Sequence, residues 1–192
     1  MIKEAIKKLV AGNDLTFDEA AQVMDEMFSG TATQSQMAAY LTALRIKGET
    51  IDEITASAQV MREKALHIKP NRDVLDIVGT GGDGTGTFNI STTAAFIIAA
   101  AGIPVAKHGN RSMSSKSGSA DCLEQLGINI NITPEKSEEV LNKAGICFMF
   151  AQGYHSSMKY VGPVRKEIGI RNIFNVLGPL TNPAGADLQV TG

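Results

Sequence analysis

Residues 79–86 form a glycine-rich loop, Gly-Thr-Gly-Gly-Asp-Gly-Thr-Gly, in which five of eight positions are glycine. Glycine accepts positive φ and, having no Cβ, lets backbone N–H groups approach an anion closely. The loop lies between an apolar run typical of a buried strand and one typical of a helix, whose N-terminal end would offer further N–H groups. Since a simple turn needs only one or two glycines, the pattern predicts a phosphate site.

Two common phosphate-binding motifs fit this loop less well. Gly79, Gly81 and Gly84 match G-x-G-x-x-G, but a dinucleotide site also needs an acidic residue about 20 positions further on to bind the ribose hydroxyl. The next predicted strand ends in Lys107-His108 instead. A P-loop needs a lysine directly after its last glycine, and none follows here. Both absences argue against a nicotinamide-dependent dehydrogenase and a P-loop nucleotidase.

A second loop, residues 107–119, gathers cations and serine hydroxyls. No Asp or Glu occurs from Gly84 to Ala120, a span of 37 residues, although acids make up 20 of the 192 residues. A locally basic patch in a chain of net charge −2 suits a diphosphate better than a polymer backbone. Both loops leave the carboxyl ends of predicted strands, where α/β sheets bind ligands. We therefore expect one multiply phosphorylated small molecule between them.

Helix signals dominate residues 1–68. Three capping boxes follow one another: Thr16 with Glu19, Thr33 with Gln36, and Thr50 with Glu53. Each predicts a helix start, because the hydroxyl and the carboxylate or amide satisfy each other's free backbone N–H. Apolar residues then recur at helical spacing until Gly30 and Gly48. A short helix is expected before them, around residues 2–10. These apolar stripes predict a helical lobe.

After Pro70 the pattern changes to strands that alternate with helices, which predicts a parallel α/β sheet. We expect strands at 74–78, 104–106 and 146–150, with helices at 89–101, 121–126 and 134–143. Residues 187–192 resemble the beginning of another strand, so we expect a truncated chain. The predicted domains are a helical lobe at 1–68, joined by helices from about 163–180, and an α/β domain at 72–192 that is incomplete at its C-terminal end.

Composition narrows the class of protein. A chain that is 43% hydrophobic and 20% charged is ordinary for a globular protein, and its net charge of −2 argues against a general nucleic-acid or membrane-surface binder. Charged residues interrupt the first ten positions, which argues against a signal peptide. Cys122 and Cys147 lack CxxC spacing and are expected to be reduced thiols of a cytoplasmic protein.

Residues 76–92, 107–121, 165–171 and 175–183 closely resemble, in this order, the anthranilate phosphoribosyltransferase family. The resemblance implies a nucleoside phosphorylase/phosphoribosyltransferase-like architecture, with an all-α N-terminal lobe and an α/β domain. It also implies an activity in tryptophan biosynthesis. The phosphoribosyl group of phosphoribosyl diphosphate would be transferred to the amine of anthranilate, giving N-(5-phosphoribosyl)anthranilate and diphosphate. A homodimer through the helical lobe is implied as well.

The resemblance further implies the roles of individual residues. Phosphoribosyl diphosphate would be bound by Gly79, Gly82, Asp83, Thr87, Asn89, Ile90, Ser91, Thr92, Lys107, His108, Gly109, Asn110, Arg111, Ser112, Met113, Ser114, Ser115 and Ser119. Gly79, Asn110 and Arg165 would contact anthranilate, with Arg165 pairing its carboxylate. Ser91 would bind a Mg²⁺ ion that also binds the diphosphate. No residue is assigned as an acid or base. His108 and His155 would line the substrate channel, with a surface role for His155 as the alternative.

Two alternatives remain. A non-catalytic, nucleic-acid-binding relative of the same fold would need an extended basic surface. A pyrimidine nucleoside phosphorylase would carry a Lys-His-Ser-Thr-Gly-Gly type loop, which is absent here.

The resemblance also implies a longer chain. Chains of the anthranilate phosphoribosyltransferase family are longer, and an Asp-Glu pair that binds metal lies beyond the position of residue 192. We therefore expect these 192 residues alone to show weak turnover or none.

Overall fold

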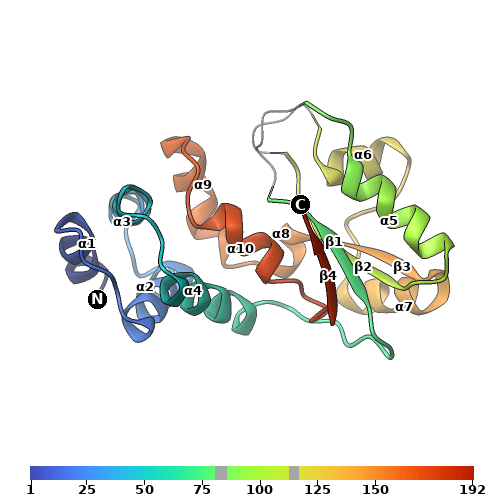
Figure 1. Ribbon diagram of the computed structural model, residues 1–192, viewed down its shortest axis with the longest axis horizontal. Coiled ribbons are helices and arrows are strands. Elements are labelled where there is room, and N and C mark those ends of the chain that lie inside the picture. Colours follow the sequence, from blue (N-terminus) through green and yellow to red (C-terminus); the bar gives the residue numbers. More distant parts are fainter. Residues whose placement is uncertain (81–85, 113–116) are drawn as a thin grey trace. The chain divides into compact units, whose positions relative to one another are not determined.

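The computed structural model describes residues 1–80, 86–112 and 117–192. The chain divides into two compact units (Figure 1). The helical unit contains Met1–Lys64 and His155–Thr181, and the α/β unit contains Ala65–Tyr154 and Asn182–Gly192. Each unit is therefore assembled from two separate stretches of the chain.

The helical unit consists of six helices. They are α1 (Ile2–Val10), α2 (Phe17–Ser29), α3 (Gln34–Lys47), α4 (Ile51–Glu63), α9 (Met158–Ile168) and α10 (Phe174–Leu180). The three predicted capping boxes are all formed, at the first residues of α2, α3 and α4. Each threonine hydroxyl accepts from the N–H three residues on, and the side chain there accepts from the threonine N–H.

The core of the helical unit joins both of its chain segments. Val23, Met27 and Leu41 from the first segment are fully buried in one cluster with Val161 and Leu177 from the second. The rings of Phe28 and Phe174 also meet across this boundary, with centroids 6.0 Å apart. Burial of these large side chains is the main stabilising term, worth about 1.5–3 kcal/mol for each. The helices α9 and α10 therefore complete the core that α1–α4 begin.

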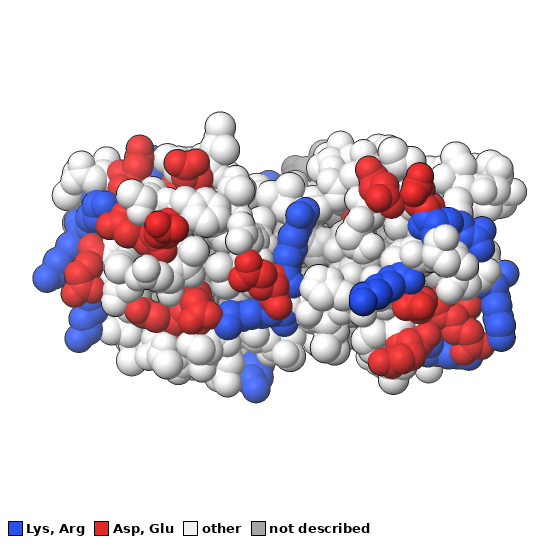
Figure 2. Space-filling view, turned by 90° about the horizontal axis from the view of Figure 1, so that it is seen from below, with Lys and Arg blue, Asp and Glu red and all other residues white. Residues whose placement is uncertain are grey.

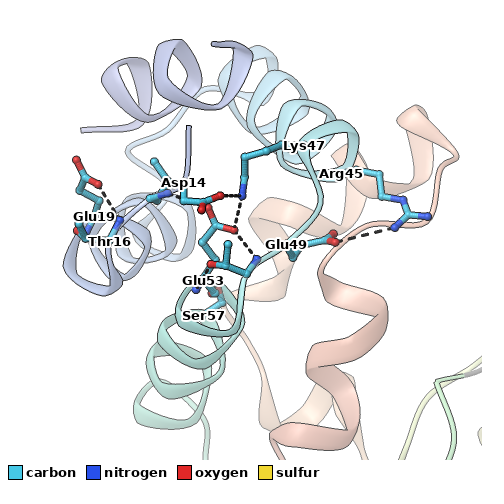
Figure 3. Close-up of polar contacts among 10 residues, drawn as sticks. Asp14, Thr16, Glu19, Arg45, Lys47, Glu49, Glu53 and Ser57 are labelled. Carbon is cyan, nitrogen blue, oxygen red and sulfur yellow. Dashed lines mark hydrogen bonds and ion pairs between the residues drawn. The ribbon is translucent and has the colours of Figure 1, made fainter. Parts of the chain in front are cut away.

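A buried carboxylate ties three helix ends together in this unit (Figure 3). Glu53 is fully buried at the start of α4. Its oxygens accept from the Leu15 N–H at 2.9 Å, from the Thr50 N–H at 2.8 Å and from Lys47 Nζ at 3.0 Å. Lys47 also pairs with Asp14 at 2.7 Å. Because each Glu53 oxygen has a donor, the cost of burying its charge is offset.

The α/β unit is built on a four-stranded parallel sheet, which confirms the predicted fold class. Its strands are β1 (Leu75–Val78), β2 (Val105–Gly109), β3 (Ile146–Phe150) and β4 (Leu188–Thr191), in the order β3-β2-β1-β4. The helices are α5 (Ile90–Ala100), α6 (Ser119–Gln125), α7 (Pro134–Ala144) and the short α8 (Ala151–Tyr154). The residues predicted to begin a strand at 187–192 form β4 against β1.

Alternate residues of the strands direct the helices to opposite faces of this sheet. On β3, Cys147 and Met149 pack with Leu141 of α7, whereas Phe150 packs with Leu123 of α6. Ile77 and Val105, on the neighbouring strands, pack with Ala95 of α5. Figure 1 shows the sheet lying between these helices. This arrangement leaves the carboxyl ends of β1 and β2 free to carry the two loops singled out by the sequence.

The surface carries charges of both signs, as the near-neutral composition of the chain predicts. On the face seen in Figure 2, acidic and basic side chains are mixed over each unit. In the part of the chain that the structure describes, no helix has the length and apolar character needed to cross a bilayer.

Candidate functional site

The two predicted loops begin side by side. β1 ends at Val78 and β2 at Gly109, and these strands are parallel neighbours. Residues 79–80 and 110–112 therefore leave the same edge of the sheet (Figure 1). Of the predicted site, Gly82 and Asp83 lie outside the described residues, as do Met113, Ser114 and Ser115.

A direct hydrogen bond joins the far ends of the two loops. Asn89, the residue before α5, donates from its side-chain amide to the Gly118 carbonyl at 2.9 Å. Asn89 makes no side-chain cap to its own helix, so its amide links the loops instead. Sequence reasoning assigned Asn89 to the ligand and missed this link. The bond joins the segment that follows the glycine loop to the end of the basic loop, within one unit.

The first turn of α5 places hydroxyl groups beside this link. Thr87 is exposed, Ser91 is partly buried and Thr92 is buried. Ile90 begins the helix, and its N–H donates to the Phe88 carbonyl at 2.7 Å. The N-terminal end of a helix carries a partial positive charge and favours an anion nearby. The structure thus supplies the helix N-terminus that the glycine loop predicted.

Below the loops, the sheet contains a buried cation and a buried carboxylate. Lys107 is buried, and its Nζ donates to the Ile77 carbonyl at 2.6 Å. Burial lowers the pKa of Lys107, although the nearby Asp76 carboxylate acts in the opposite direction. The Lys107 ammonium thus lies against the last residues of β1, the strand that precedes the glycine loop.

Asp76 is a residue of this region to which sequence reasoning gave no role. Its Oδ1 accepts from the backbone N–H of His108 at 3.2 Å, and its Oδ2 accepts from Gln189 at 3.4 Å. Burial raises the pKa of the Asp76 carboxyl, and its hydrogen bonds only partly offset this. The available signal was an acidic residue inside an otherwise apolar strand, Val-Leu-Asp-Ile-Val. Asp76 joins β1, β2 and β4 just below the loops.

The basic loop is less basic in three dimensions than in sequence. Arg111 Nη1 pairs with Asp121 Oδ1 at 2.8 Å and with Glu124 Oε2 at 2.6 Å, both from α6. The guanidinium also lies over the ring of Phe150, 5.5 Å from its centroid. The 37-residue stretch without acids ends one position before Asp121, so the sequence pattern overlooked these partners. The positive charge of Arg111 is consequently already balanced.

Arg165, in the helical unit, differs from Arg111 in having no carboxylate partner among the described residues. It lies on α9, its Nε is buried without a hydrogen-bond acceptor, and burial lowers the pKa of its guanidinium. The guanidinium lies over the ring of Phe174, 5.2 Å from its centroid. Among the described residues no carboxylate pairs with it. A half-buried cation without a counter-ion is a candidate site for an anionic ligand.

The remaining predicted residues divide between the units. Gly79, Asn110 and Ser119 belong to the α/β unit, where Gly79 and Asn110 are exposed and Ser119 begins α6. His108 and His155 are both buried, so the surface alternative for His155 is wrong.

A cavity of about 440 Å³ also lies in the α/β unit, but its chemistry differs from that of the loops. Its walls are mostly apolar side chains of α5, α7 and β3, including Phe96, Val140 and Phe148. Thr92 and Lys107 contribute to the lining, yet Lys107 directs its ammonium to Ile77. An apolar lining suits neither a diphosphate nor a ribose, so this cavity is a poorer candidate for an anion than the loops.

Fold and site together define an α/β protein with two candidate ligand-binding loops at the carboxyl ends of neighbouring parallel strands, and with a helical bundle as its second unit. Comparison with family models makes this specific. The model described as the a/b domain of the glycosyl transferase family matches residues 71–192, and the model of its helical bundle domain matches residues 3–65. The chain belongs to this glycosyl transferase family.

Individual relatives agree with this assignment. An anthranilate phosphoribosyltransferase of Ruminiclostridium cellulolyticum is 60% identical over 192 residues, which are all of this chain and 56% of the relative. One of Methanobrevibacter smithii is 62% identical over all of this chain and 57% of the relative. The chain thus spans a little over half the length of these curated relatives.

Solved structures show the same correspondence. Anthranilate phosphoribosyltransferase from Thermus thermophilus matches with a TM-score of 0.91 at 49% identity, covering 98% of this chain and 57% of that one. The enzyme from Saccharomyces cerevisiae in complex with PRPP and Mg matches with a TM-score of 0.91 at 27% identity, covering 100% of this chain and 58% of that one.

Proposed function

We propose that this chain carries the phosphoribosyl-diphosphate-binding part of an anthranilate phosphoribosyltransferase of tryptophan biosynthesis. The observation that supports the proposal is the Asn89–Gly118 hydrogen bond, because it joins the segment that follows the glycine loop to the end of the basic loop. The family assignment and the names of the relatives support the same activity.

In this proposal the ligand's phosphates lie against backbone N–H groups and hydroxyls, supported from beneath by a cation. Glycine-rich backbone after β1 and the start of α5 supply the N–H groups. Lys107 contributes through the field of its buried ammonium, since its Nζ is already bonded to Ile77. Thr87, Ser91 and Ser119 supply hydroxyl groups. Gly82, Asp83, Met113, Ser114 and Ser115 stay part of the proposal on the strength of the sequence resemblance.

The described residues fit a Mg²⁺ ion that is held largely by its ligand. Among them, no three His, Cys, Asp or Glu side chains lie together as a metal site. Mg²⁺ commonly takes only one or two protein ligands and fills its octahedron with water and substrate phosphate oxygens. The hydroxyl of Ser91, in the first turn of α5, would be one such ligand. When bound, the ion would neutralise negative charge on the diphosphate.

The acceptor would be positioned by Arg165. Its guanidinium combines a planar pair of donors with a half-buried environment and no carboxylate partner among the described residues. This combination suits the carboxylate of anthranilate, since arginine binds carboxylates in bidentate geometry. Gly79 and Asn110 stay proposed anthranilate contacts on the strength of the sequence resemblance.

The reaction would displace diphosphate from C1 of the ribose by the amine of anthranilate. A bond forms between the amine nitrogen and C1 while the bond from C1 to the diphosphate oxygen breaks, through an oxocarbenium-like state. Such a reaction depends on stabilising the leaving diphosphate and aligning the amine. The proposal assigns the first role to the loops of the α/β unit and the second to Arg165, and no side chain is assigned as a general acid or base.

Isothermal titration calorimetry of this chain with phosphoribosyl diphosphate tests the proposal. We expect saturable one-to-one binding that strengthens when Mg²⁺ is added, and a weaker response to Mg²⁺ in Ser91→Ala. Absence of binding would contradict the proposal. Cleavage of a pyrimidine nucleoside, or salt-sensitive binding of DNA, would favour one of the two alternatives instead.

We also propose that the intact protein is a cytoplasmic homodimer that associates through the helical unit. Val10, Ile46 and Ile51 leave 75%, 81% and 83% of their surface exposed on the helices of that unit. The interface is proposed from the sequence resemblance, and these exposed apolar side chains are its candidate contacts. The two cysteines are both free, which suits a reducing compartment. Sedimentation velocity with Ile46→Glu and Ile51→Glu variants tests the interface, and unchanged dimerisation would contradict it.

A further inference from the structure

The basic loop leaves the fold and returns to it through a narrow neck, defined here as residues 110–112 and 118–121. The Ala120 N–H donates to the Asn110 carbonyl at 3.3 Å across the neck. A Cβ added to Gly118 would lie 2.7 Å from the carbonyl carbon of Arg111 and would collide with the Ser112 nitrogen. The two sides of the neck are thus in backbone contact, and only glycine fits at position 118.

Both carboxylate oxygens of Asp121 are used to hold this neck closed. Asp121 Oδ2 accepts from the Gly118 N–H at 2.8 Å and from the Ser112 N–H at 3.3 Å, which lie on opposite sides of the neck. Asp121 Oδ1 accepts from Arg111 at 2.8 Å. These contacts lower the pKa of the Asp121 carboxyl, with the Gly118 N–H as the largest cause, so the group is ionised at neutral pH.

Arg111 is held on the side of the neck by two carboxylates. Glu124 receives both ends of the guanidinium, Nη1 at 2.6 Å and Nη2 at 2.9 Å, while Asp121 receives Nη1 as well. The ring of Phe150 lies against the same group. A guanidinium with these partners is occupied, and it also cancels carboxylate charge that would otherwise repel a nearby diphosphate.

The neck is connected to the start of α5 through the backbone of a single residue, Gly118. The Gly118 carbonyl accepts from the Asn89 amide at 2.9 Å and from the Cys122 N–H at 3.1 Å, while the Gly118 N–H is held by Asp121. Gly118 therefore connects the Asp121 carboxylate, which holds its N–H, to the Asn89 amide, which holds its carbonyl at the start of α5.

We infer that Asp121 is the positioning residue that fixes the basic loop against the start of α5, and that Arg111 closes the neck instead of contacting the diphosphate. This inference rests on the proposed function, because the ligand that the loop positions is phosphoribosyl diphosphate. Asp121 itself touches no ligand; it acts through the backbone of Ser112 and Gly118.

Titration calorimetry of the 192-residue chain with phosphoribosyl diphosphate and Mg²⁺ separates these roles. Loss of a hydrogen bond to a charged group is expected to raise Kd about tenfold in Asp121→Asn and in Arg111→Gln. In the double variant the removed carboxylate charge compensates for the missing guanidinium, so Kd is expected to be no higher than in Arg111→Gln alone. A rise in Kd at an unchanged melting temperature separates the positioning role from a purely structural one.

Glu139→Gln is the matched control. Glu139 is also a carboxylate between two cations in the α/β unit, Lys136 at 2.9 Å and Lys143 at 2.8 Å, but it lies on α7 and away from the neck. The Kd of Glu139→Gln for phosphoribosyl diphosphate is expected to equal that of the unsubstituted chain. Thermal melts show whether each variant folds. If Asp121→Asn does not fold, Glu124→Gln replaces it in the titrations, because it removes the other carboxylate partner of Arg111.

The possible outcomes distinguish this inference from the proposed function. If the unsubstituted chain does not bind phosphoribosyl diphosphate, the proposed function fails and this inference fails with it. If the unsubstituted chain binds and folded Asp121→Asn binds equally well, only the positioning role of Asp121 is overturned. If the two substitutions multiply, to about a hundredfold in the double variant, Arg111 contacts the diphosphate directly and the inference is also wrong.

Discussion

Replacing the buried carboxylate of Glu53 by alanine should cost the helical unit much of its stability. In the native structure Glu53 accepts from two backbone N–H groups and from Lys47, whose side chain is only 6% exposed. Glu53→Ala removes the common acceptor and leaves all three donors buried or nearly so. Breaking a buried ion pair by deleting one partner costs about 3–5 kcal/mol. That is a large part of the 5–15 kcal/mol that typically stabilises a domain.

Glu19 provides the comparison for this prediction. Like Glu53, it is the third residue of a helix, completes a capping box with a threonine and pairs with a lysine, Lys8 at 2.8 Å. It differs in being partly exposed, since 27% of its side chain is accessible. Water can replace its contacts, so Glu19→Ala should cost far less than Glu53→Ala.

Urea denaturation followed by circular dichroism measures the two effects in one experiment. We expect the midpoint to fall strongly for Glu53→Ala and only slightly for Glu19→Ala, with similar slopes. A double substitution, Glu53→Ala with Lys47→Met, should regain part of the loss, because it removes an almost buried ammonium whose only remaining carboxylate partner among the described residues is Asp14. Equal effects of the two alanine variants would refute the reasoning, since burial would then not decide the energy of the pair.

Three further predictions concern the loops and the thiols. Gly118→Ala should destabilise the chain by about 1–3 kcal/mol in a thermal melt, because the new methyl group meets the backbone of Ser112; an unchanged melt would show that the neck is looser than described. Arg165→Ala should weaken anthranilate binding about 10- to 100-fold in calorimetry on the full-length enzyme and leave phosphoribosyl diphosphate affinity unchanged; equal anthranilate affinity would refute its role. Burial raises the pKa of Cys147 to about 12. At pH 8, iodoacetamide should therefore modify the partly exposed Cys122 and spare Cys147 in the native protein. Mass spectrometry that shows Cys147 modified before Cys122 would contradict the packing of β3.

The sequence predicted the local structure well because local signals determine it. Each capping box needs only two side chains three residues apart, and all three formed where Thr16, Thr33 and Thr50 indicated. The parallel sheet followed in the same way from the alternation of strands and helices. The short helix α8 was missed, because its four residues have no room for a periodic apolar pattern.

Contacts between distant residues were beyond such signals. The loops were expected to be neighbours because both follow strands of one parallel sheet. Nothing in the sequence, however, indicated that Asn89 donates to Gly118, or that Arg111 pairs with Asp121 and Glu124. These pairs depend on how the two ends of a loop approach each other, and on which rotamers the surrounding packing permits. The basic character of residues 107–119 was therefore overestimated at Arg111.

The same limit explains the residue to which the sequence assigned no role. Asp76 lies in an apolar strand, where an acidic residue is uncommon and so was a usable signal. Its partners, the His108 N–H and Gln189, are 32 and 113 positions away in the chain. Only the strand order β2-β1-β4 brings them together around its carboxylate.

The central claim is that two loops at one edge of the sheet bind a single phosphoribosyl diphosphate molecule. Amide chemical shifts of the isotopically labelled chain, followed by NMR during titration with this ligand and Mg²⁺, test the claim most directly. We predict that signals from residues 79–92 and from residues 107–119 shift together and give one common Kd, while those of α7 stay in place. Shifts confined to one loop, or two different dissociation constants, would contradict a shared site.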